Sequence, residues 1–210
     1  MAERADEVEN TATKLDDAVP ASSWYALSIL LLVYVFNFLD HSILGILAQP
    51  IKEDLGLSDT QMGFMGGIAF ALFYTLMGIP IARLADRTVR KTLLAICLAL
   101  WSGMTVLCGF ATSFTYLLLA RIGVSIGEAG GSPPSHSMIS DLFPEHKRAT
   151  ALSIYALGIP IGAMLGSLVG GTINAEYGWR VDFIAVGAPG PLLALIVQFT
   201  LKEPERGAST

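Results

Sequence analysis

An apolar segment of the chain contains ionisable residues that can do chemistry inside a membrane. Residues 121–134 read RIGVSIGEAGGSPP, and steps of three and four place five polar residues on one helix face: Arg121, Ser125, Glu128, Ser132 and Ser135. Each charged group at membrane depth costs roughly 2.5–3.5 kcal/mol, and such groups usually face a bundle interior or a water-filled cavity. The stripe therefore indicates a functional site. The alternative is an Arg–Glu pair that only ties helices together.

A second polar group lies within one turn of another apolar segment and consists of Asn37, Asp40 and His41. Asp40 is about 10 Å from the predicted outer end of its helix, and Arg121 is about 8 Å from the outer end of its own. The two side chains can therefore meet across a helix pair. Glu128 lies about 18 Å down, nearer the middle of the membrane. We predict that these five residues line a cavity for proton coupling or substrate.

The expected chemistry is the binding and release of protons by buried carboxylates. Burial favours the protonated form of a carboxyl group, whereas a nearby arginine favours the ionised form. Asp40 and Glu128 can therefore switch between ion-paired and protonated states as Arg121 approaches or a binding site opens. Two alternatives stay open. Each carboxylate can form a permanent interhelical salt bridge, and His41 can titrate, contact a ligand, point outward or simply be hydrogen-bonded.

The composition is that of a membrane protein. Of 210 residues, 53% are hydrophobic and only 15% are charged, below the ~25% usual in soluble domains. Apolar stretches near twenty residues long recur along the chain, which predicts a polytopic membrane protein. The net charge of -5 is concentrated at the start, where residues 1–20 carry six acidic and two basic side chains. The near-neutral remainder offers no basic surface for nucleic acid.

Six membrane-spanning helices are predicted, over residues 24–47, 62–82, 92–111, 116–139, 152–173 and 183–201. Polar turns are expected at residues 49–59 and 143–148, and the last helix is interrupted by Pro189-Gly190-Pro191. The transmembrane domain is predicted over residues 21–203. Residues 1–20 lack the basic start of a signal peptide and are predicted to be a disordered acidic cytoplasmic tail, with residues 204–210 as a cytoplasmic end.

The distribution of lysine and arginine predicts the orientation. Two basic residues, Lys52 and Arg180, lie on one side of the predicted helices. Ten lie on the other side: Arg4, Lys14, Arg83, Arg87, Arg90, Lys91, Lys147, Arg148, Lys202 and Arg206. Cytoplasmic loops carry the excess of basic residues. Both termini are therefore expected in the cytoplasm, with the chain crossing a plasma membrane, as in the bacterial inner membrane, several times.

Small residues recur every four positions in the fifth predicted helix: Gly158, Gly162, Gly166 and Gly170, with Pro160 beside them. Such a ridge lets another helix approach closely, so we predict a helix-packing motif. Cys97 and Cys108 lie about 16 Å apart along one helix, too far for a disulfide, and are interpreted as packing residues.

The sequence has no catalytic or metal-binding constellation. It lacks a phosphate-binding lysine loop, a His-Glu-x-x-His pair and any Cys or His cluster with metal spacing. Ser135-His136 alone is too little for a nucleophile and its base. We therefore predict that the protein is not an enzyme, holds no metal, and needs no cofactor other than a proton or other ion gradient.

Several motifs resemble the major facilitator superfamily. Residues 82–91, ARLADRTVRK, resemble its motif Gly-x-Leu-Ala-Asp-Arg-x-Gly-Arg-Arg between the second and third helices, with Ala82 and Val89 in place of the glycines. Residues 121–127 resemble its fourth-helix motif, which starts with Arg, and residues 158–162 its fifth-helix Gly-Pro motif. The stretches YGWR (177–180) and KEPERG (202–207) are also typical of the superfamily.

A narrower resemblance is to Spinster-like transporters. It rests on the stretches NFLD (37–40), GEA (127–129) and DLFP (141–144). His41 stands where that branch often has Arg.

The resemblance covers residues 24–207 and implies one half of a two-half fold, with six transmembrane helices arranged as a 3+3 inverted repeat. Residues 204–210 would then begin the central loop of a full-length transporter. The implied function is a secondary carrier that works by alternating access and is driven by protons or another ion. Its solute would be small and organic or amphipathic, with anionic and lipid-like molecules among the candidates. The matching coupling positions are Asp40, Arg121 and Glu128, and the cytoplasmic gate motif is Asp86, Arg87 and Arg90.

The implied partners are a small-molecule substrate, the lipid bilayer, and either a second six-helix half or a second copy of the chain. A homodimer is geometrically possible because the two halves of the family fold run parallel. Two other functions stay open: a non-transporting membrane scaffold, and a half-transporter that is inactive without a second half. A scaffold has no reason to keep three ionisable residues in lipid. An integral-membrane enzyme is disfavoured by the missing catalytic constellation.

Overall fold

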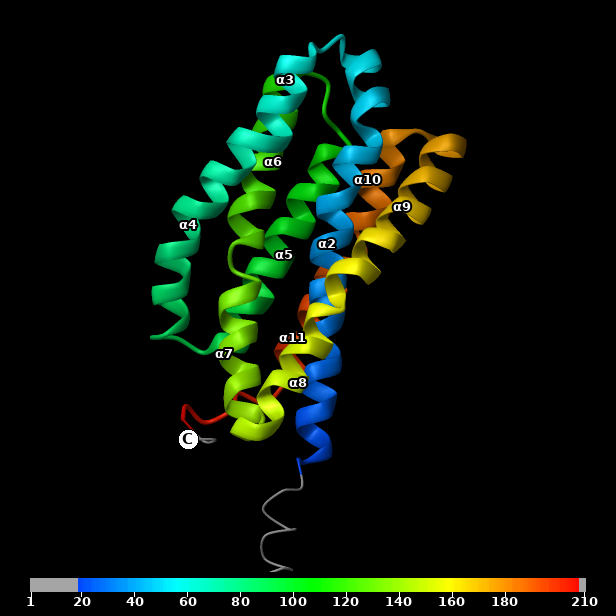
Figure 1. The fold of residues 1–210 in the computed structure, drawn as a ribbon. Coiled ribbons are helices and arrows are strands. Elements are labelled where there is room, and N and C mark those ends of the chain that lie inside the picture. The colour runs from blue at the N-terminus through cyan, green and yellow to red at the C-terminus, as the bar shows by residue number, and fades with distance from the viewer. Residues whose placement is uncertain (1–18, 208–210) are drawn as a thin grey trace, which may run out of the picture.

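The computed structural model describes residues 19–207, which are helical almost throughout and contain no strand within that range. Most of the predicted tail, residues 1–18, and the last three residues lie outside the described part. The elements run in the order α2 (Ala21–Leu55), α3 (Asp59–Gly63), the π-helical segment η1 (Phe64–Ala69), α4 (Phe70–Ala85), α5 (Arg90–Cys108), α6 (Phe114–Glu128), α7 (Ser132–Leu142), α8 (Glu145–Ala156), α9 (Gly158–Tyr177), α10 (Trp179–Gly187) and α11 (Pro189–Thr200) (Figure 1).

Five helical segments of the described chain are long and apolar enough to cross a membrane: Ala21–Leu55, Asp59–Ala85, Arg90–Cys108, Glu145–Tyr177 and Trp179–Thr200. The remaining predicted span, residues 116–139, is α6 followed by α7, and the two run one after the other along the bundle in Figure 1. The predicted continuous helix is wrong at this point. Gly130 and Gly131 weaken the helix, and Pro133 and Pro134, which lack an N–H, sit in the first turn of the new one. Six spans are therefore confirmed, the fourth in two pieces.

Two predicted turns are largely helical instead. The first span does not end at residue 47, because α2 continues through Pro50 to Leu55. It stops at Gly56, whose φ of 63° lets its N–H bond to the carbonyl of Lys52. The turn predicted at 143–148 shrinks to Phe143 and Pro144, since α8 begins at Glu145. In both places polar residues with good helix propensity were mistaken for a loop.

The packing of the spans shows an internal two-fold relationship. The first span, α2, packs on the fifth, α9, and the second, α4, packs on the fourth, α6. The third, α5, packs on the sixth, formed by α10 and α11. A two-fold relationship would relate span one to span four, two to five, and three to six. Under that exchange the contact between spans one and five becomes the contact between four and two, and the contact between three and six is unchanged. This is the pattern expected of a 3+3 inverted repeat, and it confirms the predicted fold class.

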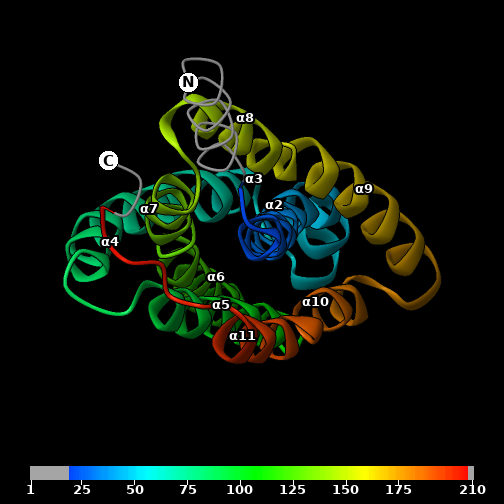
Figure 2. The same ribbon diagram turned by 90° about the horizontal axis from the view of Figure 1, so that it is seen from below.

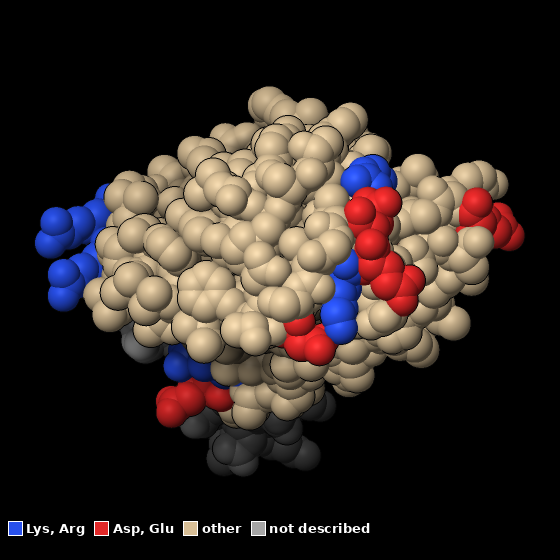
Figure 3. Space-filling view, turned by 90° about the horizontal axis from the view of Figure 1, so that it is seen from above, with Lys and Arg blue, Asp and Glu red and all other residues tan. Residues whose placement is uncertain are grey.

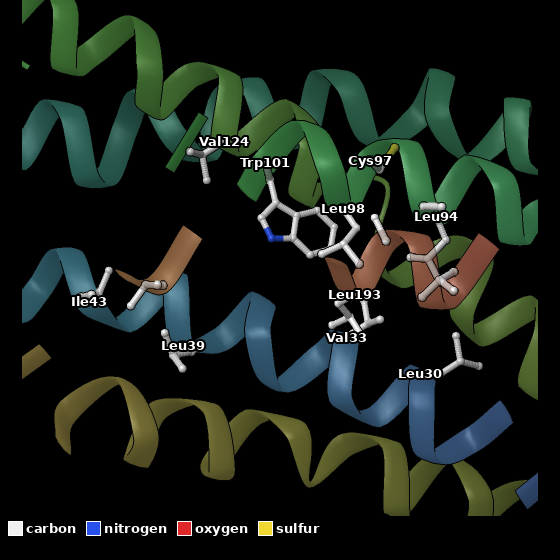
Figure 4. Packing of buried hydrophobic residues seen from close by; sticks show 14 of the residues in the cluster. Leu30, Val33, Leu39, Ile43, Leu94, Cys97, Leu98, Trp101, Val124 and Leu193 are labelled. Atoms are coloured by element: carbon white, nitrogen blue, oxygen red, sulfur yellow. The ribbon is translucent and has the colours of Figure 1, made fainter. Parts of the chain in front are cut away.

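The apolar core lies between α2, α5 and α11. Seen from below, α2 is inside the bundle, with α9 on one side and α10 and α11 on the other (Figure 2). In Figure 4, side chains of α2 point toward those of α5 and α11, and the buried residues labelled there include Leu30, Val33, Leu94, Leu98, Trp101 and Leu193. The two cysteines, Cys97 and Cys108, are buried free thiols. This core fixes how α2 stands beside α5 and α6, which carry the polar residues.

The glycine ridge of α9 lies directly against α2. Gly158, Gly162, Gly166 and Gly170 are all buried. A Cβ added to Gly162 would lie 2.5 Å from the carbonyl oxygen of Val35, and one added to Gly166 would lie 3.1 Å from that of Leu39. Pro160 is exposed on the other side of the helix. The glycines thus let two backbones approach with no side chain between them.

The two ends of the bundle differ in charge. Seen from the end predicted to face outward, the surface is mostly uncharged, with one mixed cluster of acidic and basic side chains and further charged side chains around the rim (Figure 3). The helix ends there carry two ion pairs at the surface, Lys52–Asp59 at 2.5 Å and Arg180–Asp54 at 2.7 Å. The opposite end contains most of the lysine and arginine residues, as the sequence predicts.

Candidate functional site

Asp40 and Arg121 form an ion pair inside the bundle. One carboxylate oxygen of Asp40, Oδ1, accepts a hydrogen bond from Arg121 Nη1 at 3.0 Å, and each residue is only 2% exposed. The second oxygen, Oδ2, accepts a short hydrogen bond from the hydroxyl of Thr105 on α5. The Arg121 guanidinium also lies over the Phe70 ring, 5.2 Å from its centroid. The charges of the first and fourth spans therefore neutralise each other, with the third span holding the carboxylate.

Glu128 lies two helical turns from Arg121 on α6 but does not pair with it. Its Oε2 lies 3.7 Å from Nδ1 of His41, while its Oε1 has no hydrogen-bond partner among the described residues. The Glu128 side chain is 1% exposed, whereas that of His41 is 51% exposed. Because consecutive helical residues point about 100° apart, Asp40 faces Arg121 while His41 faces Glu128. Two carboxylates of one site thus have different partners.

A cavity of about 320 Å³ opens beside Glu128. Its walls are mainly aromatic, with Tyr34 and Phe38 from α2 facing Phe70 and Tyr74 from α4. Its polar lining includes Asn37, His41, Thr75 and Glu128, along with Ser132 at the start of α7. The volume is at the lower end of the range for ligand pockets, which usually combine apolar walls with a few polar groups. We call this cavity the aromatic pocket.

A second cavity, of about 480 Å³, lies nearer the predicted outer end of the bundle. It is lined by the glycines of α3 and η1, by Leu44 and by Arg121. His41 lines both cavities. The imidazole is therefore placed to move a proton between Glu128 and the outer cavity, using a group that titrates near neutral pH in most proteins.

All five residues predicted for the cavity come together in one region. Asn37 lines the aromatic pocket, and its amide nitrogen Nδ2 is buried without a hydrogen-bond partner among the described residues. Asp40 is inaccessible from that pocket because it is enclosed by Arg121 and Thr105. The expected approach of Arg121 to both carboxylates is not what the structure shows, since Arg121 is bonded to Asp40 alone.

The predicted cytoplasmic gate motif divides into two parts. Arg90 is 1% exposed and donates hydrogen bonds to two segments of the chain. In α7 its partners are Ser137 Oγ at 2.8 Å and Asp141, and after α11 they are Glu203 Oε1 at 2.7 Å and the carbonyl of Pro204 at 2.7 Å. Glu203 also accepts from the backbone N–H of Lys91 at 3.0 Å, so it caps the start of α5. Asp86 and Arg87 are exposed, and Arg206 donates a hydrogen bond to the backbone carbonyl of Asp86.

Three features of the site were not predicted. Thr105 is one hydroxyl in an apolar helix, and the sequence gives no reason to single it out. The aromatic walls of the pocket look like ordinary core residues until α2 and α4 are placed side by side. Asp182 in α10 is fully buried, and neither of its carboxylate oxygens has a partner among the described residues. It lies directly before the last predicted span at 183–201, and nothing in the sequence singled it out.

No metal site is formed by the described residues, which contain no group of three or more His, Cys, Asp or Glu side chains able to hold an ion. The chemistry that the arrangement can perform is proton uptake at Glu128 and His41, together with recognition of a small ligand in the aromatic pocket.

Comparison with known proteins identifies the family. The model of the Major Facilitator Superfamily matches residues 30–210. An "MFS-type efflux pump" of Mycolicibacterium smegmatis is 39% identical over 85% of this chain and 42% of its own length. "Protein spinster" of Drosophila melanogaster is 29% identical over 91% of this chain and 32% of its own length.

A solved structure agrees in fold as well as sequence. The crystal structure of a bacterial homologue of the human lysosomal transporter Spinster, in an inward-facing and unoccupied conformation, is similar with a TM-score of 0.86 and 42% identity. That match covers 90% of this chain and 45% of the other. The chain thus spans less than half the length of these relatives. With its six helical spans it is a multi-pass membrane protein that belongs to the Major Facilitator Superfamily, a family of transporters rather than enzymes, and it resembles the Spinster-like branch.

Proposed function

We propose that this chain forms one six-helix half of a secondary active transporter, which moves a small organic or amphipathic solute by alternating access and is driven by a proton gradient. The observation that carries the proposal is the Glu128–His41 contact at the wall of the aromatic pocket, where one Glu128 oxygen has no hydrogen-bond partner among the described residues. A buried carboxylate beside a half-exposed imidazole can take up and release a proton next to a bound solute.

The Asp40–Arg121 pair has a different part in this scheme. It joins the first span to the fourth, and its charges are almost completely removed from water. Breaking such a pair leaves an uncompensated buried charge, at a cost of about 3–5 kcal/mol. A movement that separates α2 from α6 would therefore be accompanied by protonation of Asp40, and closure would expel that proton. The pair can thereby couple opening of the site to proton binding.

The scaffold alternative is less well supported. A scaffold does not require Asp40, Arg121 and Glu128 inside the membrane, where each costs roughly 2.5–3.5 kcal/mol. Nor does it require an unpartnered carboxylate oxygen on a pocket wall. The names of the relatives support transport of organic solutes, since they include an efflux pump and the "Probable L-galactonate transporter" of Escherichia coli, which is 31% identical over 81% of this chain.

Orientation and assembly belong to the same proposal. The excess of basic residues favours both termini in the cytoplasm of a cell whose plasma membrane the chain crosses. The relatives are more than twice as long as the matched part, so transport should require a second six-helix half or a second copy of this chain. Transport by a verified monomer, in liposomes that each hold a single copy, would show that neither is needed.

The test uses a transport-competent assembly in liposomes, either the dimer or the chain joined to a second half. Radiolabelled galactonate, lysophosphatidylcholine and 2-phenylethylamine are supplied under an imposed pH difference, and the best-transported solute is carried forward. Glu128→Gln and Asp40→Asn keep the side-chain shape but cannot titrate. Each should abolish accumulation driven by the pH difference while passive exchange stays measurable.

Two variants control this experiment. Glu176→Gln removes an exposed carboxylate far from the site and should leave accumulation unchanged. Arg121→Ala should impair both accumulation and exchange, because it leaves Asp40 buried without its partner. If the Glu128 and Asp40 variants both still concentrate solute with only a pH difference applied, proton coupling at these residues is wrong. The two carboxylates would then act as structural ion pairs.

A further inference from the structure

The charge and the walls of the aromatic pocket identify the class of solute. Resting on the transport function proposed above, we propose that this pocket binds an organic cation, namely a protonated amine attached to a small apolar or aromatic body. Glu128 receives the ammonium group, and the rings of α2 and α4 enclose the body.

The first argument is the charge of the lining. Of the two cationic groups near the site, Arg121 faces the outer cavity and is already bonded to Asp40. The aromatic pocket itself is lined by one carboxylate, Glu128, and by His41, which is charged only when protonated. An anionic solute would find no permanent cation on these walls and would be repelled by Glu128. The wall therefore favours a positive ligand.

The second argument is the unpartnered carboxylate oxygen. The Glu128 side chain is almost wholly buried, yet its Oε1 has no donor among the described residues. A buried acceptor without a donor is costly, and an ammonium group supplies up to three N–H donors that can satisfy it. Binding of the ammonium would also favour the ionised carboxylate. His41, at 3.7 Å from the other oxygen, leaves Oε1 available for the ligand.

The third argument is the aromatic enclosure. The Tyr34 and Phe38 rings are 5.0 Å apart by centroids, and those of Phe70 and Tyr74 are 6.2 Å apart. The two ring pairs face the same cavity from different spans. Aromatic faces attract cations as well as apolar groups, and such enclosures are used to recognise ammonium ligands. Nearby, the amide nitrogen of Asn37, which has no partner within residues 19–207, can donate to a hydroxyl or ether oxygen of the ligand.

The test compares three probes of nearly the same shape and different charge: 2-phenylethylamine, 2-phenylethanol and phenylacetate. Binding of each to the full chain in nanodiscs is measured by isothermal titration calorimetry near neutral pH, where the amine is a cation and phenylacetate an anion. The amine is expected to bind about tenfold or more tightly than the alcohol, with phenylacetate weakest. Equal binding of all three, tighter binding of phenylacetate, or binding of none would overturn the proposal.

Variants locate the binding. Glu128→Gln should remove most of the preference for the amine over the alcohol, while Glu176→Gln should leave it intact. Should Glu128→Gln fail to fold, Phe38→Leu provides the second measurement, with an expected loss of amine affinity of severalfold and a smaller loss for the alcohol. An amine preference that survives both changes would overturn the assignment to this pocket.

The outcome is separate from that of the transport experiment. If galactonate or lysophosphatidylcholine is accumulated under a pH difference and 2-phenylethylamine neither binds nor is transported, the proposed function stands and the solute class is wrong. If 2-phenylethylamine binds through Glu128 but no solute responds to a pH difference, the solute class stands and proton coupling is wrong.

Discussion

Substituting one glycine of α9 gives a quantitative test of the helix packing that positions the site. In Gly162→Ala, the new Cβ would lie 2.5 Å from the carbonyl oxygen of Val35, 2.7 Å from Cβ of Phe38 and 3.0 Å from the backbone nitrogen of Leu39. Two of these atoms belong to the α2 backbone, which cannot rotate away as a side chain can. The substitution must therefore push α9 away from α2, the helix that holds Asp40 and His41.

The expected cost follows from two opposing effects. Overpacking of a tight core costs about 1–3 kcal/mol, whereas alanine gains up to about 1 kcal/mol over glycine in helix propensity. The net loss of stability should be about 1–2 kcal/mol, or a fall of roughly 2–8 °C in Tm for a chain of this size. The matched control is Gly171→Ala on the same helix, where the added Cβ meets nothing within 4 Å. That variant should match or exceed the parent in stability.

The assay uses the two buried thiols. Cys97 and Cys108 react with a fluorogenic maleimide only as the protein unfolds, so the rise of fluorescence on heating reports Tm in detergent. Gly162→Ala should melt below both the parent and Gly171→Ala. If Gly162→Ala melts at the same temperature as Gly171→Ala, or above it, the close approach of α9 to α2 is not part of the folded protein.

Three further predictions concern other parts of the chain. A cysteine at Ser58 should react with an impermeant maleimide added to intact cells and one at Thr88 should not, and the reverse pattern would invert the proposed orientation. Asp182→Asn should be at least as stable as the parent at pH 8 in the same thermal assay, because an amide in that unpartnered site carries no charge to bury; a fall of several degrees would reveal a partner for the carboxylate. Glu203→Gln should lower stability by about 1–2 kcal/mol, because it removes the charge that binds Arg90 and caps α5, and an unchanged Tm would show that this contact contributes nothing.

The sequence alone was sufficient for the membrane fold because the bilayer fixes the length and composition of each span. The predicted helix ends were wrong where polar residues with good helix propensity extend a helix, as at residues 49–55 and 145–148. The sequence also failed to divide the fourth span, since the glycines and prolines at 130–134 occur in continuous membrane helices too. Depth along a helix was predictable because each residue rises 1.5 Å, which placed Asp40 and Arg121 at similar levels. The structure brings those two together at 3.0 Å.

Only the tertiary structure decided the partners of each charge. The sequence placed Asp40 and Arg121 at similar levels, where they can meet, but it gave no sign that Glu128 contacts His41 rather than Arg121. That choice depends on how α2 crosses α6, which is set by the α9 glycines behind it and by the leucines of α5 in front. The partners of Thr105 and Arg90 also depend on how the helices pack. Arg90 binds Asp141 and Glu203, which are 51 and 113 residues away along the chain. Spacing along a helix determines which residues share a face, but only the packing of several helices determines what that face touches.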